Sequence, residues 1–440
     1  MKFRILTLCL ALLLVGCSIG SSTPSELAEA STAPTTVPLA SAAATTPAVS
    51  AGPTQTAEQS AAPSEAATAP ASTTAETAAT TTAATSEASA APAAATQVIA
   101  PPQQVALPPG FTISVYAQDL GTPRFLAYSP EGVLHVTDSR GGRVLALPDA
   151  NGDGVADETQ VVISDLRQPH GITFHEGALY VGETDKIVKF ERAGDGWGEK
   201  QVLVSDIPTG GHGTRTVVFG TDGKMYVSIG SSCNVCEEDS PLRAAVWQYN
   251  ADGSGGKLYT KGLRNAVGLA LRPGSDEIWA SNNGRDMLGD DLPPETVNVL
   301  ADGADFGWPR CHAGRLVDPD YGGQSGCEGV KAPAVEMQAH SAPLGLRFYD
   351  GQMFPAEYQG NLFVAFHGSW NRSDPTGYKL VRVPVDESGQ AGAVQDFATG
   401  WLQADGDSWG RPVDVIVAAD GSLMVSDDSG GRVYRIFYQG

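Results

Sequence analysis

Residues 217–228 read Val-Val-Phe-Gly-Thr-Asp-Gly-Lys-Met-Tyr-Val-Ser, an apolar segment, a turn and a second apolar segment. β-Branched and aromatic residues on both sides of Asp222-Gly223 predict a β-hairpin, because glycine supplies the positive φ that such turns require. The same unit recurs at residues 125–138, 171–181, 269–280, 344–366 and 415–426. The sequence therefore repeats one strand–turn–strand unit six times.

The spacing of the copies predicts their arrangement. Gly132, Gly177 and Gly223 lie 45 and 46 residues apart, about the length of one four-stranded propeller blade. Later copies are spaced more widely, so inserted loops are expected there, with residues 310–340 shaping a rim. We predict an all-β fold, a six-bladed β-propeller over residues 101–440, preceded by a disordered linker. Functional residues should lie on loops around one mouth of the central channel.

The two ends of this region are predicted to share a blade. Residues 433–437 read Val-Tyr-Arg-Ile-Phe and residues 111–116 read Phe-Thr-Ile-Ser-Val-Tyr, and both have the composition of strands. Pairing between these two segments would close the ring of blades.

The N-terminus has the pattern of a targeting segment. Lys2 and Arg4 precede an apolar run over residues 5–15, which predicts a signal peptide at residues 1–16. This run is too short to span a membrane as a mature helix, and no later stretch is long and apolar enough to do so.

A lipid anchor and a linker are predicted to follow. Leu14-Val15-Gly16-Cys17 resembles the bacterial lipobox, in which the cysteine is lipidated; the alternative is an ordinary secretory signal with an incidental cysteine. Residues 17–100 are almost wholly Ala, Thr, Ser and Pro, which cannot bury a core and predict a disordered linker. We expect an exported protein, anchored through Cys17 to the outer face of a bacterial membrane, at the cell surface or in the periplasm.

The charge balance excludes one class of partner. The chain has 440 residues and a formal net charge of −22, and residues 101–440 carry 26 basic and 44 acidic groups. Binding to phosphate backbones needs a basic surface, so no nucleic-acid partner is expected. No Gly-rich dinucleotide turn opens a βαβ unit, which argues against a nicotinamide cofactor.

Four segments together resemble a known family. They are Gly-His-Gly-Thr-Arg-Thr-Val-Val-Phe at 211–219, Gly-Leu-Arg-Asn-Ala-Val-Gly-Leu at 262–269, Asn-Gly-Arg-Asp at 283–286 leading to Phe-Gly-Trp-Pro at 306–309, and Phe-His-Gly-Ser-Trp-Asn-Arg at 366–372. The set is similar to the glucose/sorbosone dehydrogenase family, which uses pyrroloquinoline quinone (PQQ) on six-bladed propellers. The likeness is greater to the sorbosone and pyranose dehydrogenase branch. It implies PQQ and Ca²⁺ as cofactors, a sugar substrate and an external electron acceptor such as a quinone, cytochrome or dye.

The resemblance assigns roles to three residues near the reacting atoms. His212 would be the general base that takes the proton of the substrate hydroxyl while hydride passes to the quinone. Arg264 and Asn265 would contact the quinone, with Arg264 stabilising the negative charge that develops on it. The alternatives are a loop histidine with a structural hydrogen bond and a surface arginine in an ion pair.

The resemblance also implies a calcium site and further cofactor contacts. Backbone carbonyls of Gly284 and Arg285 would hold the ion, with Asn283 beside them, since calcium prefers oxygen ligands. The acids Asp290, Asp291 and Glu295 either support this site or form a solvated loop. The other implied cofactor contacts are Arg124, His170, His367, Trp370, Asn371, Arg372 and Arg411.

A second calcium signal comes from the residues themselves. Asp149, Asn151 and Asp153 stand at alternate positions before Gly154, and Asp157 follows. Calcium loops place oxygen ligands in this way around a glycine turn. We interpret the segment as a structural calcium loop between blades; the alternative is a solvated acidic turn.

The cysteines predict disulfides. Cys233, Cys236, Cys311 and Cys327 are an even set in an exported protein, which favours two bridges. Three pairings are possible, and proximity in the sequence favours Cys233 with Cys236 and Cys311 with Cys327. The alternatives for Cys-x-x-Cys are a redox pair or half of a zinc site.

Two classes of function therefore compete. The leading hypothesis is a lipid-anchored, PQQ-dependent dehydrogenase that oxidises an aldose-like or sorbosone-like hydroxyl. The alternative is a calcium-bearing propeller that acts as a lactonase-like hydrolase or as a non-catalytic module binding carbohydrate or protein.

Overall fold

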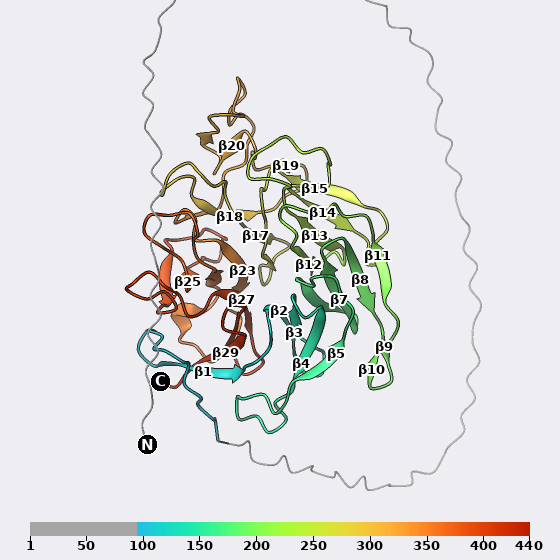
Figure 1. The fold of residues 1–440 in the computed structure, drawn as a ribbon, viewed down its shortest axis with the longest axis vertical. Helices are drawn as coiled ribbons and strands as arrows, with labels where there is room; N and C mark the ends of the chain where they lie inside the picture. The colour runs from blue at the N-terminus through green and yellow to red at the C-terminus, as the bar shows by residue number, and fades with distance from the viewer. Residues whose placement is uncertain (1–94) are drawn as a thin grey trace, which may run out of the picture. The chain divides into compact units, whose positions relative to one another are not determined.

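The computed structural model describes residues 95–440, so the predicted signal peptide, Cys17 and the linker up to residue 94 lie outside the described residues. Six larger sheets, five of four strands and one of five, are arranged in a ring (Figure 1). The predicted all-β, six-bladed propeller is confirmed. The described part contains one 3₁₀ turn, η1 (Ala356–Tyr358), and no helix with the length and hydrophobicity of a membrane span.

Each blade runs outward from an inner strand that lines the central channel. Blade 1 consists of β2 (Pro123–Tyr128), β3 (Leu134–Asp138), β4 (Arg143–Leu147) and β5 (Gln160–Ile163). Blade 2 consists of β6 (Ile172–His175), β7 (Ala178–Glu183), β8 (Lys186–Phe190) and β11 (Gln201–Val204). Blade 3 consists of β12 (Arg215–Phe219), β13 (Met225–Ile229), β14 (Ala245–Tyr249), β15 (Lys257–Lys261) and the short parallel β19 (Ala304–Asp305).

The second half of the ring follows the same order, except in its last blade. Blade 4 consists of β16 (Leu269–Leu271), β17 (Ile278–Asn282), β18 (Glu295–Val299) and β22 (Val335–Met337). Blade 5 consists of β23 (Pro343–Phe348), β24 (Leu362–Phe366), β25 (Lys379–Val383) and β26 (Gln395–Ala398). Blade 6 consists of β27 (Pro412–Val417), β28 (Leu423–Asp427), β29 (Arg432–Tyr438) and β1 (Phe111–Ala117).

The chain closes the ring by pairing its two ends, as predicted. β1 runs antiparallel to β29, with Phe111 opposite Tyr438 and Val115 opposite Tyr434. The first strand therefore completes the sheet built by the last three (Figure 1). Apolar side chains pack between neighbouring blades; Phe363 of blade 5 and Tyr434 of blade 6 belong to one buried cluster.

Acidic residues at the ends of second strands fix the loops at one mouth of the channel. Oδ1 of Asp138 accepts a hydrogen bond from the backbone N–H of Thr122 (2.9 Å), just before the inner strand of blade 1. Oδ1 of Asp427 accepts one from the N–H of Arg411 (2.8 Å), just before the inner strand of blade 6. These carboxylates satisfy backbone donors that would otherwise lack partners, and so hold the start of each inner strand in place.

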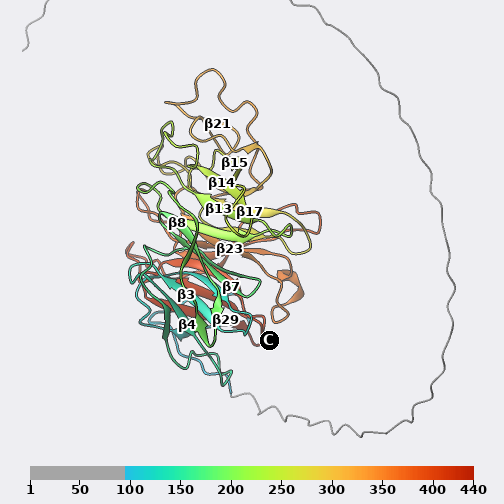
Figure 2. The same ribbon diagram turned by 90° about the vertical axis from the view of Figure 1, so that its right-hand side faces the viewer.

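Insertions extend two blades. The hairpin of β9 (Arg192–Ala193) and β10 (Gly196–Trp197) lies within blade 2. The hairpin of β20 (Cys311–His312) and β21 (Leu316–Val317) lies within the segment between β19 and β22 and projects at the top of Figures 1 and 2.

Both predicted disulfides are present. Cys233 pairs with Cys236, and Cys311 pairs with Cys327 in the projecting segment. A bridge that closes a loop of about 15 residues contributes about 3 kcal/mol in the loop-entropy description. The second bridge is therefore expected to stabilise a segment that has little regular structure of its own.

Asp414 is a buried carboxyl group on the wall of the channel. It lines a cavity of about 340 Å³ together with the inner strands of the blades. Its Oδ2 accepts a hydrogen bond from the N–H of Leu126 (2.9 Å). Burial raises the pKa of Asp414 to about 7, although this backbone donor opposes the rise.

The effect of Asp414→Asn on stability, measured against wild type, should be more favourable at pH 8 than at pH 5. Because folding raises the pKa of Asp414 from 3.8 to about 7, the folded chain holds this proton more tightly. Wild-type stability therefore falls as the pH rises through this window. Between pH 5 and pH 8, the difference in unfolding free energy between variant and wild type should grow by on the order of 1–4 kcal/mol. Urea unfolding at both pH values measures it; an equal difference at both would contradict the prediction.

Candidate active site

A cavity of about 230 Å³ lies where the inner strands begin, at one mouth of the channel. Loops from blades 1, 3, 4, 5 and 6 form its wall. The structure brings together on this wall eleven residues that the sequence analysis singled out, namely Arg124, His212, Arg264, Asn265, Asn283, Gly284, Glu295, His367, Trp370, Asn371 and Arg411. Residues far apart in the sequence therefore converge on one site, as predicted for a propeller.

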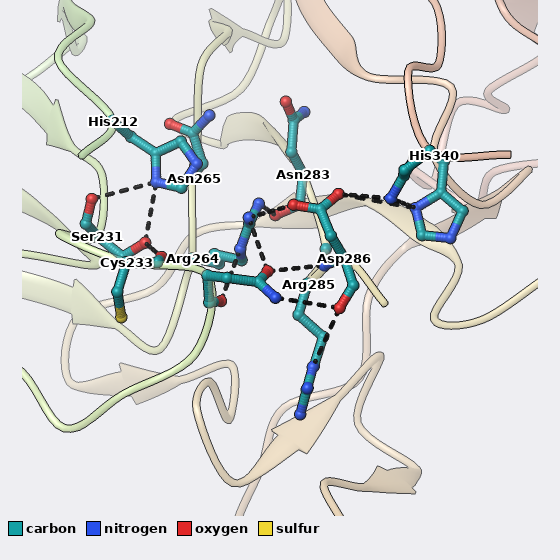
Figure 3. Close-up of polar contacts among 12 residues, drawn as sticks. His212, Ser231, Cys233, Arg264, Asn265, Asn283, Arg285, Asp286 and His340 are labelled. Carbon is teal, nitrogen blue, oxygen red and sulfur yellow. Dashed lines mark hydrogen bonds and ion pairs between the residues drawn. The ribbon is translucent and has the colours of Figure 1, made fainter. Parts of the chain in front are cut away.

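Hydrogen bonds fix the tautomer of His212. Its Nδ1 lies 3.1 Å from the carbonyl oxygen and 2.9 Å from Oγ of Ser231 (Figure 3). A carbonyl oxygen only accepts, so Nδ1 carries the proton and Nε2 keeps a free lone pair. Burial, together with the charge of Arg264, lowers the pKa of His212 to about 4. The imidazole is therefore neutral near pH 7 and able to accept a proton.

Arg264 is held by its neighbours on two sides of its guanidinium. Nε donates to the carbonyl oxygen of Asn234 (2.9 Å). Nη2 donates to Oδ1 of Asn234 (3.0 Å) and to Oδ2 of Asp286 (2.8 Å). Nη1 has one long contact, 3.4 Å to the carbonyl oxygen of Asn283. Since Nη1 bears two hydrogens, at least one N–H of Arg264 remains for a ligand.

The two motifs that contain Asn265 and Asn283 are hydrogen-bonded to each other. The N–H of Asn283 donates to the carbonyl oxygen of Asn265 (3.0 Å). The N–H of Asn265 in turn donates to Oδ1 of Asn282 (3.1 Å). Among the described residues, the buried Oδ1 of Asn265 has no hydrogen-bond partner. A buried acceptor without a partner is costly, so this atom is suited to a donor or a cation supplied by a ligand.

Glu295 is hydrogen-bonded to the segment in which carbonyl ligands for calcium are predicted. Its Oε2 accepts the N–H of Gly284 at 2.6 Å. Burial raises the pKa of Glu295 to about 7, against the hydrogen bonds from Gly284 and Ala342. Glu295 lines the cavity and is 3% exposed, so this acid is not part of a solvated loop.

The side chain of Arg285 points away from the cavity. Nη1 forms ion pairs with Asp318 (2.5 Å) and Asp320 (3.2 Å) of the projecting segment. Figure 3 shows the side chain of Arg285 directed away from His212. The segment from 310 to 330 therefore packs behind the site, while His340 is the part of the expected rim insertion that reaches the cavity wall.

A second histidine is oriented by a carboxylate. Nε2 of His367 donates to Oδ1 of Asp428 (2.9 Å), and Nη1 of Arg124 pairs with Oδ2 of the same carboxylate (2.5 Å). Burial lowers the pKa of His367 to about 4, so its Nδ1 is an acceptor in the neutral ring. Arg411 donates through Nε and Nη2 to the carbonyl oxygens of His367 and Gly368.

His340 and Asn371 complete the wall on the side of Asp286. Nδ2 of Asn371 donates to Oδ1 of Asp286 (2.8 Å) and lies 3.2 Å from Nδ1 of His340. Nε2 of His340 donates to the carbonyl oxygen of Gly289 (2.9 Å). Oδ1 of Asn371 is a second buried acceptor without a partner within the described residues.

Three predicted cofactor contacts lie at or beyond the edge of this cavity. Trp370 is 70% exposed at the rim. His170 is buried in the wall of an adjoining cavity, with Nε2 3.2 Å from Nη2 of Arg124. Arg372 is not brought to either wall, because Asp290 and Asp291 hold its guanidinium outside.

The predicted calcium loop keeps its carboxylates occupied with backbone donors. Asp149 accepts the N–H groups of Asp153 and Gly154, and Asp157 accepts that of Ala150. Nδ2 of Asn151 donates to Asp153 and Asp157. Among residues 95–440, only Cys233, Cys236 and Glu238 bring three histidine, cysteine or carboxylate ligand atoms within 4.8 Å of one another, and both of these cysteines are in a disulfide. Calcium at this loop stays a prediction.

Several residues of the site were not assigned from the sequence. Asp286 directly follows Asn-Gly-Arg, and Asp428 directly follows a second strand of the repeat, so position within the motif and the repeat could have found both. Ser231 and Asn234 carry no such signal, because they reach the site through contacts between loops.

Comparisons with known proteins place the fold and the site in context. The TrAA12-like family model matches residues 105–315 and 320–439. A Borreliella burgdorferi protein bearing the name "Uncharacterized protein" is 34% identical over 291 residues, which cover 62% of this chain and 76% of that protein. The pyrroloquinoline quinone-dependent pyranose dehydrogenase of Coprinopsis cinerea is 26% identical over 406 residues, 76% of this chain and 55% of that protein. The chain thus spans about half the length of that relative.

A solved structure is similar to this chain over the propeller. The holo form of the pyranose dehydrogenase PQQ domain from Coprinopsis cinerea is similar with a TM-score of 0.66 and 25% identity. The match covers 77% of this chain and 98% of that domain. The similarity therefore extends over the whole propeller.

Proposed function

Because the chain belongs to the TrAA12-like family of PQQ-dependent sugar dehydrogenases, we propose that it oxidises a sugar hydroxyl with PQQ. The single observation that carries the proposal is the pair His212 and Arg264 on one cavity wall. His212 offers an unprotonated Nε2, and Arg264 offers an uncommitted N–H on Nη1. A base and a cation at one site suit the removal of a proton and the stabilisation of negative charge.

The cavity wall fits PQQ, which carries three carboxylates and an ortho-quinone. Arg124, Arg264 and Arg411 supply positive charge on an otherwise acidic protein. Within residues 95–440 no carboxylate lies within 4.0 Å of Arg411, so its charge is available to an anion. The orphaned amide oxygens of Asn265 and Asn371 suit a donor or a bound cation. We propose that these five residues, with His367, hold the cofactor.

When bound, PQQ supplies the acceptor for the hydride of the substrate carbon. Nε2 of His212 accepts the proton of the substrate hydroxyl, while Ser231 keeps Nδ1 protonated and the ring in one orientation. Nη1 of Arg264 faces the negative charge that develops in the transition state. Trp370 presents an exposed ring at the rim, which suits the apolar face of a sugar.

We also propose that Ca²⁺ binds at this site. The ligands would be the backbone carbonyls of Gly284 and Arg285, beside Asn283. The buried carboxyl of Glu295, which contacts Gly284, supports the proposal, because a cation would stabilise its ionised form. A structural Ca²⁺ on the loop of Asp149, Asn151, Asp153 and Asp157 remains a separate proposal.

The cellular setting is proposed from the sequence. The protein would be exported and held to the outer face of a bacterial membrane by a lipid on Cys17. Its substrate would be an aldose-like or sorbosone-like sugar, and its electrons would pass to an external quinone, cytochrome or dye. The net negative charge of the sequence argues against a nucleic-acid partner, and the absence of a Gly-rich dinucleotide motif argues against a nicotinamide acceptor.

Dye-linked oxidation of sugars tests the proposed reaction. The purified chain is loaded with PQQ and Ca²⁺ and assayed against a panel of aldoses, sorbosone-like sugars and lactones. Sugar-dependent dye reduction that requires PQQ is the expected result. Lactone hydrolysis that needs Ca²⁺ alone would instead support a hydrolase, for which the described residues offer no cluster of three carboxylate ligand atoms.

A further inference from the structure

The loop closed by the Cys233–Cys236 disulfide lies behind both His212 and Arg264. It belongs to the long connection between β13 and β14, which contains no strand. We propose that Asn234 in this loop is a positioning residue, and that the disulfide-closed loop sets both the tautomer of His212 and the orientation of Arg264. The effect proposed for Asn234 on catalysis rests on the proposed function. The effect proposed for the loop on the positions of His212 and Arg264 does not.

Asn234 uses almost all of its hydrogen-bonding groups at this point. Its Oδ1 accepts from Nη2 of Arg264 (3.0 Å) and from the N–H of Asp286 (2.7 Å). Its Nδ2 donates to the carbonyl oxygen of Asp286 (3.1 Å). Its own carbonyl oxygen accepts Nε of Arg264 (2.9 Å) and Nε1 of Trp308 (3.3 Å). One side chain thus ties blade 3 to the two motifs of blade 4 that line the cavity.

These contacts decide which edge of Arg264 meets a ligand. Of the five N–H groups of a guanidinium, Nε and both hydrogens of Nη2 are directed at Asn234 and Asp286. Only Nη1 remains for a ligand, and Arg264 lines the cavity. Without the side chain of Asn234, Nη2 of Arg264 would lose its contact to Oδ1 and the backbone of Asp286 would lose two hydrogen bonds. The guanidinium would then be held by the backbone carbonyl oxygen of residue 234 and by a less restrained Asp286.

The same loop orients His212. Oγ of Ser231 donates to the carbonyl oxygen of Cys233 (2.7 Å), so its lone pairs face Nδ1 of His212 (2.9 Å). The backbone continues this link, because the N–H of Ser231 donates to the carbonyl oxygen of Arg264 (2.8 Å). The hydroxyl of Ser231 would turn if the carbonyl of Cys233 moved. The position of the loop therefore bears on both reacting groups.

The disulfide is a covalent restraint on this loop, in addition to its hydrogen bonds. Cys233 and Cys236 flank Asn234 and are half-buried, so a reductant can reach them. On the outer side, the N–H of Ser232 donates to Oε1 of Glu238 (2.7 Å). With no strand pairing nearby, the covalent bridge restricts the conformations open to Asn234.

Asn234→Ala tests the positioning role, with Asn250→Ala as the matched control. Asn250 is also half-buried in blade 3, and it bonds Ser254 and Lys224 away from the cavity. In the PQQ-loaded chain, Asn234→Ala should lower kcat about 10- to 100-fold, with a smaller change in KM, since misplacement of a reacting group has this effect. Asn250→Ala should leave kcat within about twofold of wild type.

A second readout needs no cofactor. In the chain without PQQ, the imidazole of His212 is titrated by NMR. Burial lowers the pKa of His212 most, and the charge of Arg264 lowers it further. A guanidinium that leaves its place should therefore shift this titration toward its ordinary range. Asn234→Ala should shift it, and Asn250→Ala should not. This readout stays valid even if wild type shows no PQQ-dependent activity, a result that would overturn the proposed function alone.

The disulfide is tested by the double variant Cys233→Ser/Cys236→Ser. It should shift the titration of His212 in the same direction as Asn234→Ala, whereas Cys311→Ser/Cys327→Ser should leave the titration at its wild-type position. Unchanged titration and kcat in Asn234→Ala would overturn the positioning role. An unchanged titration in the Cys233→Ser/Cys236→Ser variant would overturn the role of the bridge.

Discussion

Replacing His212 with alanine should lower kcat of the PQQ-loaded protein about 10³-fold, because general-base catalysis commonly contributes 10²–10⁴. The imidazole is neutral near pH 7 and holds its free lone pair on Nε2, so it alone accepts the substrate proton in the proposed reaction. Affinity for PQQ should change little, since the cationic wall remains. Dye reduction under substrate saturation and a PQQ titration by fluorescence measure the two quantities.

The control for this variant is His175→Ala. His175 stacks on Phe219 with ring centroids 3.8 Å apart and does not line the cavity. Its loss should affect stability and leave kcat near the wild-type value. A His212→Ala protein that binds PQQ and turns over within tenfold of wild type would show that another group accepts the proton.

Replacing Arg264 with glutamine should lower kcat/KM about 10²- to 10³-fold, the usual cost of removing a preorganised donor from developing negative charge. The substitution also leaves Asp286 without its ion pair, so binding of the anionic cofactor should weaken. Lysine at this position keeps the charge but cannot reproduce the contacts of Nε and Nη2, and should restore only part of the activity. Steady-state kinetics and PQQ titration of both variants measure these effects.

Arg272→Gln is the matched control. Nε of Arg272 pairs with Glu277 at 2.7 Å in the turn between β16 and β17, and Arg272 does not line the cavity, so the same chemical change is made away from it. Its kcat/KM should equal that of wild type. If Arg264→Gln behaved like this control, the guanidinium would have no part in transition-state stabilisation.

Most of the fold was predictable from the sequence because its unit is local. Each hairpin places its turn glycine between two apolar strands, and six such units allow few arrangements other than a ring of blades. Pairing of β1 with β29 and both disulfides were also predicted, since strand composition and proximity of the cysteines carry that information. The anchor at Cys17 and most of the predicted linker stay predictions, because residues up to 94 fall outside the described residues.

The site was predictable where a motif directly precedes or follows a strand. His212, Arg264 and Arg411 come shortly before inner strands, so the fold places all three at the same mouth of the central channel. Asn234 could not be found in this way, since it arrives on an irregular loop that a disulfide closes. The prediction for Arg372 did not account for the acidic loop that holds its guanidinium away from the cavity.

The central claim is that PQQ binds beside His212 and is reduced by a sugar. The most direct test is an anaerobic titration of the chain with PQQ and Ca²⁺, followed by an excess of a pyranose while the absorbance of the cofactor is recorded. We predict saturation at one PQQ per chain and a change to the reduced spectrum in wild type, with the same change about 10³-fold slower in His212→Ala. Failure to bind PQQ at micromolar concentration, or an oxidised spectrum in wild type with every pyranose, would contradict the account.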